Sequence, residues 1–101
     1  MDDNQLRRAL RSVGYRCFIV YKDVFLDTSI PMDAAARHLH VTEKTWSMGG
    51  CLMRVSHARR IVESGRVDDA MKLIAKSKID PILTRIAEQW ISGDRIKAFT
   101  V

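Results

Sequence analysis

Polar side chains suited to hydrogen bonding gather between residues 42 and 47 of this 101-residue chain. They are Thr42, Glu43, Lys44, Thr45 and Ser47. On an exposed helix, the hydroxyls and the ammonium group can reach base edges or phosphates in the major groove of DNA, and the carboxylate can accept from a cytosine amino group. The same residues also fit an ordinary solvated surface, with Thr42 only capping a helix.

A denser group of cations follows at Arg54, His57, Arg59, Arg60 and Arg66. Clusters of this kind neutralise phosphates and fix the position of a protein on DNA without reading sequence. Arg54 and Arg60 are six residues apart and lie on different helical faces, so we expect two or three of the four arginines to contact one duplex. Of the four, Arg66 is the one we least expect to contact the duplex. The alternative is a solvated helix face.

The residues before this group have the apolar spacing of two helices joined by a tight turn. Ala35, Leu39, Val41 and Trp46 fall where one helix is buried against the next, and Ala36 is the small residue at the closest approach. This pattern predicts a first helix from Met32 and a second, exposed helix that presents the polar set.

The stretch from residue 31 to 49, most clearly the run AAARHLHVTEKTW, resembles the helix-turn-helix regulators of bacteria, phages and plasmids. The run VTEKT matches the apolar-Ser/Thr-x-x-Thr opening of their reading helix. The resemblance implies a reading helix over Val41–Met48, sequence-specific binding of double-stranded DNA by a small transcriptional regulator, and a homodimer that reads two half-sites.

Three positions depart from the family pattern. His40 occupies the turn, where the family has Gly and where a positive φ is needed. Trp46 replaces a branched aliphatic residue, and Gly49 with Gly50 falls where a last apolar contact is expected. A second interpretation therefore stays open, with a loop over Val41–Met48 and the next helix running from near Gly50 to Ser64.

Helical periodicity along the rest of the chain predicts an all-α fold, a single domain over residues 1–101 built as a bundle of about five helices. One long or kinked helix is expected over Asp3–Leu26, with a strand over Tyr15–Tyr21 as the competing interpretation. Further helices are expected from residue 67 and from Pro81 to near Gly93, and the tail from residue 94 is left unassigned. Trp90, Ile82 and Ile86 could make residues 67–93 a dimer face.

The charge distribution points to an anionic partner. The net charge is +5, and residues 32–66 hold six of the 17 Lys and Arg residues, three of the 12 Asp and Glu residues, and all three histidines. A smaller basic stripe at Arg7, Arg8 and Arg11 is interpreted as solvated surface.

Several classes of function are disfavoured. Cys17 and Cys51 are far apart without a C-x-x-C spacing, and His38 and His40 point to different sides of a helix, so we expect no metal and no cofactor. No catalytic motif appears, and we expect no enzyme. Without an apolar run long enough for a bilayer or a signal peptide, we expect no membrane association and a cytoplasmic location.

A function of another class fits the size and charge equally well. The chain could be a non-enzymatic helical protein-interaction module, such as a phage-encoded inhibitor or adaptor that binds a host protein. The turn at His40 is the feature that keeps this alternative open.

Overall fold

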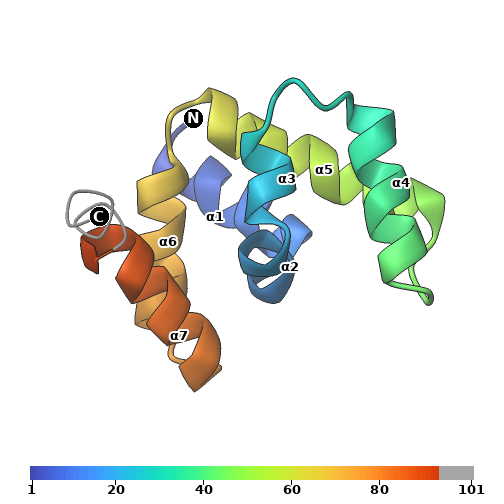
Figure 1. Ribbon diagram of the computed structural model, residues 1–101. Helices are drawn as coiled ribbons and strands as arrows, with labels where there is room; N and C mark the ends of the chain where they lie inside the picture. Colours follow the sequence, from blue (N-terminus) through green and yellow to red (C-terminus); the bar gives the residue numbers. More distant parts are fainter. Residues whose placement is uncertain (94–101) are drawn as a thin grey trace, which may run out of the picture.

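The computed structural model describes residues 1–93, and its secondary structure is entirely helical (Figure 1). The all-α prediction is confirmed. These residues form seven α-helices and one π-helical turn, which are α1 (Asp3–Val13), α2 (Tyr15–Val20), α3 (Lys22–Leu26), α4 (Met32–Thr42), α5 (Met48–Glu63), α6 (Val67–Ser77), α7 (Pro81–Glu88) and η1 (Gln89–Gly93). The unassigned tail of residues 94–101 lies outside the described part of the chain.

Helix α5 is the central element of the fold. It packs most extensively against α1 and α4, and it also contacts α3 and α6. Helices α6 and α7 form a hairpin at one side of the molecule, opposite to α4 (Figure 1). The hairpin joins the remainder through α1, α5 and α2.

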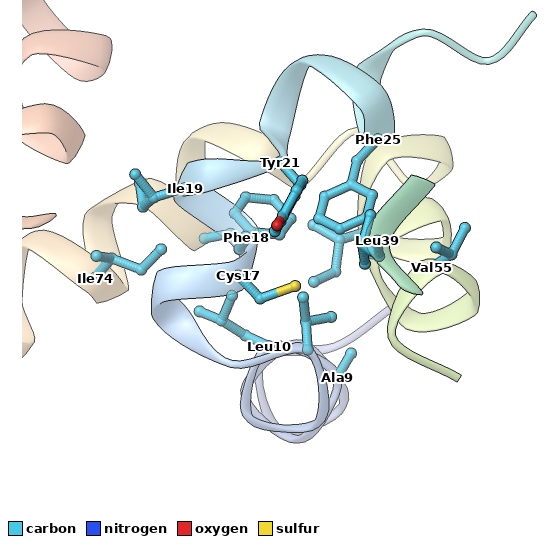
Figure 2. Close-up of a cluster of buried hydrophobic side chains, with 14 of the residues drawn as sticks. Ala9, Leu10, Cys17, Phe18, Ile19, Tyr21, Phe25, Leu39, Val55 and Ile74 are labelled. Carbon is cyan, nitrogen blue, oxygen red and sulfur yellow. The ribbon is translucent and has the colours of Figure 1, made fainter. Parts of the chain in front are cut away.

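The core contains apolar side chains from all seven α-helices. Phe18 and Phe25 stack with their ring centroids 6.1 Å apart. Figure 2 shows Leu39 beside the Phe25 ring and Val55 beyond Leu39 on α5, while Ile19 points away from them toward α6. Helix α2 therefore supplies side chains to both sides of the core. The largest fully buried side chains are Phe18, Phe25, Leu6, Leu10, Ile19, Leu39, Ile61, Met71, Ile74, Val13, Val55 and Cys17.

The helix predicted over Asp3–Leu26 is broken twice, at Gly14 between α1 and α2 and at Tyr21 between α2 and α3. Gly14 has φ +91°, a conformation that side chains disfavour, and its N–H closes α1 by donating to the Leu10 carbonyl at 2.8 Å. The strand alternative over residues 15–21 is wrong, because α2 occupies them. Each break shifts the helical phase, so Val20 is exposed, although a single continuous helix with Leu6, Leu10, Val13 and Cys17 on its buried face would turn Val20 inward, while Phe25 is buried.

The reading helix predicted over Val41–Met48 does not form. Helix α4 continues through His40 and Val41 to Thr42, and a loop over residues 43–47 precedes α5. His40 is helical, and Lys78 is the one residue other than glycine with a positive φ in residues 1–93. With no glycine at position 40, nothing stops α4 there. The alternative interpretation is correct in placing a loop before the next helix, but the loop is confined to residues 43–47, because Val41 and Thr42 belong to α4 and Met48 begins α5.

The loop is defined by its own hydrogen bonds. Ser47 caps α5, since its hydroxyl accepts a 3.0 Å hydrogen bond from the Gly50 N–H. The His40 ring lies 2.7 Å from the Trp46 carbonyl through Nδ1. Val41, predicted to be buried, has a 68% exposed side chain because α4 carries it past the contact with α5. Ala35, Ala36 and Leu39 are fully buried, as predicted.

The break at Gly14 can be tested by comparing two glycine-to-alanine substitutions. Replacing Gly14 by Ala should lower the free energy of unfolding by about 1–3 kcal/mol, because φ is +91° and the new Cβ would lie 3.2 Å from Nη1 of Arg54. Urea unfolding followed by circular dichroism measures this change. Gly49→Ala is the control, since nothing lies within 4 Å of its Cβ position. Equal effects of the two substitutions would contradict the assignment of strain to Gly14.

Candidate nucleic-acid interface

Arg59, one of the predicted phosphate contacts, is a buried structural residue. Its side chain is 6% exposed, and Nη2 donates 3.0 Å hydrogen bonds to the carbonyls of Val24 and Asp27. These carbonyls lie at the end of α3, where a helix leaves C=O groups without partners. The guanidinium satisfies them from α5, so in this structure Arg59 is committed to internal contacts and is not part of the candidate interface.

Arg54 is also held by contacts inside the protein. Nη1 donates a 2.6 Å hydrogen bond to the Val13 carbonyl, and the guanidinium carbon lies 4.0 Å from the ring centroid of Trp46. The side chain thereby connects α5 to the end of α1 and to the loop over residues 43–47. Both the hydrogen bond and the cation–π contact use the groups that would otherwise bind a phosphate.

Arg66 forms an ion-pair network at the N-terminal end of the chain. It lies 2.6 Å from Asp3 and 2.7 Å from Asp69, and it donates to the Met1 carbonyl at 2.7 Å. The hydrogen bond and the charge of Arg66 lower the pKa of Asp3, and the same pairing raises the pKa of Arg66. The network holds two carboxylates on a single guanidinium at the surface between α1 and α6, and the three groups together keep one negative charge.

Glu43, predicted to face DNA, accepts a hydrogen bond from the Tyr21 hydroxyl at 2.5 Å. Its carboxylate also lies 3.6 Å from Arg16. Burial of the phenol raises the pKa of Tyr21 to about 12, and the hydrogen bond to Glu43 adds to this shift. Glu43 therefore anchors the end of α4 to the corner between α2 and α3.

The other predicted residues of this segment divide into two kinds. Thr42 donates to a carbonyl within α4, and Ser47 caps α5. Lys44 and Thr45 are exposed, with no hydrogen bond or ion pair in the described residues. Because they lie on a loop rather than on a helix, the five side chains of this segment do not form one reading surface.

The structure does bring two predicted residues together. Arg60 and His57 of α5 line a shallow groove with Arg8 and Ser12 of α1. Arg60 and Arg8 are exposed, and neither forms an ion pair within residues 1–93. Nδ1 of His57 is shielded from solvent without a hydrogen-bond partner in the described chain. Two guanidinium groups, an imidazole and a hydroxyl thus meet at one surface depression.

A second basic groove lies on the other side of α1. It contains Arg7 of α1 with Lys72 and Lys76 of α6, and the carboxylates that line it are those paired with Arg66. Arg7 and Arg8 are adjacent in sequence and therefore point about 100° apart around the helix. Helix α1 consequently carries one cation toward each groove.

We call Arg7, Arg8, Arg60, Lys72 and Lys76 the basic face. Arg7 and Arg8 were interpreted from sequence as solvated surface, and the two lysines were not considered as binding residues. The i,i+4 spacing of Lys72 and Lys76 was a visible signal, because it places both on one side of α6. Their approach to Arg7 depends on the packing of α1 against α6, which no local pattern encodes.

Cys17 lacks the surroundings of a reactive thiol. Figure 2 shows the Cys17 sulfur directed into the hydrophobic cluster, and burial raises the pKa of this thiol to about 11. The thiol is therefore not a ready nucleophile near neutral pH. No group of three or more His, Cys, Asp or Glu residues suited to a metal ion occurs in residues 1–93.

No protein-family model, curated protein or solved structure matches this chain. Among the described helices, none combines the length and apolar character needed to cross a membrane.

The contribution of the buried Arg59 side chain to stability can be tested by comparison with its exposed neighbour Arg60. Arg59→Ala should lower the free energy of unfolding by about 2–4 kcal/mol, because two buried carbonyls lose a charged donor. Arg60→Ala, which removes an exposed guanidinium, should change it by less than about 0.5 kcal/mol. Urea midpoints of both variants check this difference. Similar midpoints would refute the structural role of Arg59.

The raised pKa of the Tyr21 hydroxyl makes the free energy of unfolding depend on pH in the alkaline range. The ordinary phenol pKa is 10 and the folded value is about 12, so the unfolded chain releases this proton first as the pH rises. The stabilisation is complete below pH 10 and is lost as the pH passes through 12. From about pH 8 to about pH 11, the wild type should lose about 1 kcal/mol more than Tyr21→Phe in urea unfolding. Equal losses would exclude this linkage.

Proposed function

We propose that this protein is a non-enzymatic protein that binds double-stranded DNA through the basic face around α1. The observation that carries the proposal is the arrangement of its five cations on both sides of one exposed helix, none in an ion pair within residues 1–93. Phosphate neutralisation by such cations supplies most of the affinity of a small protein for DNA.

The dimensions of α1 support this helix as the DNA-binding element, in place of the segment over Val41–Met48 that the sequence predicted to bind DNA. An α-helix with its side chains is about 10–12 Å wide, and the major groove is about 12 Å wide. With α1 directed toward the groove, Arg8 and Arg60 face one phosphate backbone, and Arg7 with the α6 lysines faces the other. Helix α5 is a poorer candidate, since it is buried between α1 and α4 and its exposed early residues are Leu52 and Met53.

Sequence preference would come from the polar residues between the two rows of cations. Asn4 lies on the exposed side of α1 between Arg7 and Arg8, and its carbonyl oxygen accepts from Arg7 at 3.4 Å. An asparagine amide offers the donor and acceptor pair that matches the major-groove edge of adenine. Asn4 is therefore the residue of α1 that we assign to base contact.

The first experiment is a fluorescence-anisotropy titration of duplex DNA at several salt concentrations. Arg8→Ala and Lys72→Ala should each weaken binding several-fold and reduce the slope of log K against log salt by about one, because each removes a phosphate contact. Selection and sequencing of bound duplexes should then give a preferred motif that Asn4→Ala relaxes.

Lys44→Ala is the matched control. Lys44 is an exposed cation on the loop over residues 43–47, the segment in which the sequence predicted the reading helix. It should retain the affinity and salt slope of the wild type. Loss of binding in Lys44→Ala with normal binding in Arg8→Ala would overturn the assignment to α1. Absence of salt-dependent binding in the wild type would overturn the DNA proposal and favour a protein partner.

A further inference from the structure

A large apolar depression lies between α2 and the turn that joins α6 to α7, next to the last turn of α1. Tyr15 and Leu83 provide apolar walls. Arg11 and Arg16 line the side formed by α1 and α2, whereas Asp80 lies on the side of the α6–α7 turn. The groove thus carries positive charge at one edge and negative charge at the other.

Two isoleucines project from the same turn. The Ile79 side chain is 75% exposed and the Ile82 side chain is 69% exposed. The turn itself is made by other groups, namely Lys78 in the left-handed conformation and Asp80, whose carboxylate caps α7 by accepting from the Ile82 N–H at 2.8 Å. The fold of the single chain therefore does not explain why isoleucine occupies these positions.

We propose that two copies of this chain associate through this surface, with Ile79 and Ile82 of each copy in the groove of the other. A twofold contact requires a surface that complements itself, so that residue i of one copy meets residue j of the other and the reverse. This surface has that property because Ile79, which itself lines the rim of the groove, and Ile82, which lies outside the groove at the start of α7, both project to solvent near the walls formed by Tyr15 and Leu83.

The charges have the same self-complementary arrangement. Arg11 has no ion pair within residues 1–93, and the capping bond of Asp80 uses only Oδ1. When the turn of one copy enters the groove of the other, each Asp80 approaches the Arg11 edge of its partner. A second copy fits better than an unrelated protein, because one surface supplies both members of the apolar contact and both members of the ion pair.

This association does not rest on the proposed binding of DNA, and the two surfaces meet at α1, where Arg11 of the groove lies one helical turn from Arg7 and Arg8. It also gives a specific form to the dimer face expected from sequence over residues 67–93. Ile82 belongs to the face as expected, but Trp90 is partly buried and donates to Asp68 at 3.1 Å. The partner groove comes instead from α1 and α2.

Sedimentation velocity over a wide concentration range tests the proposal with two matched variants. Ile82→Lys should raise the dissociation constant of the dimer at least about tenfold, because it places a charge in the apolar contact. Val41→Lys is the control, as Val41 is 68% exposed on α4, and it should leave the constant unchanged. Circular dichroism verifies that both variants fold, since both positions are exposed.

Charge reversal tests the arrangement of the two copies. Arg11→Glu and Asp80→Lys should each weaken the dimer, and the double variant should restore it because the reversed charges meet across the twofold axis. A wild type that stays monomeric at all concentrations, equal dimerisation of Ile82→Lys and Val41→Lys, or a failure of the double variant to recover would overturn the proposal. Open-ended growth beyond a dimer would exclude the twofold contact.

Discussion

The hydrogen bond from Arg54 to the Val13 carbonyl is the contact on which the arrangement of the first five helices depends. It forms where the glycine after Val13 ends α1, and it links that corner to the middle of the central helix. The same guanidinium lies against Trp46 and holds the loop between α4 and α5. One side chain thus fixes two chain reversals relative to α5.

The sequence predicted the fold class because hydrophobic periodicity is a local property. Ala35, Ala36 and Leu39 face inward as their spacing indicates. The pattern could not give the breaks at Gly14 and Tyr21, since a change of helical phase is decided by which partner helix the next segment meets. It also could not show that His40 would continue α4, because the polar residues after it suit a loop and a new helix equally well.

The candidate interface was harder to predict for an electrostatic reason. A cluster of arginines in sequence looks like a cationic surface, yet Arg54, Arg59 and Arg66 direct their guanidinium groups to carbonyls and carboxylates of the protein itself. The exposed positive charge comes from three helices, α1, α5 and α6, of which α1 is distant in sequence from the other two. The position of the densest basic run in the sequence therefore does not locate the exposed cations of the folded chain.

The central position of α5 also has a consequence for the order in which the chain can fold. The contacts of α4 with α5 and of α6 with α7 join neighbouring segments, so their loop-closure entropy is small and they can form early. Helix α1 must reach α5 across a separation of 41 residues, as in the Arg54 bond to Val13. The surface that joins α1 to α5 and α6 is therefore assembled late, and the cations of that surface come together only when the whole domain has folded.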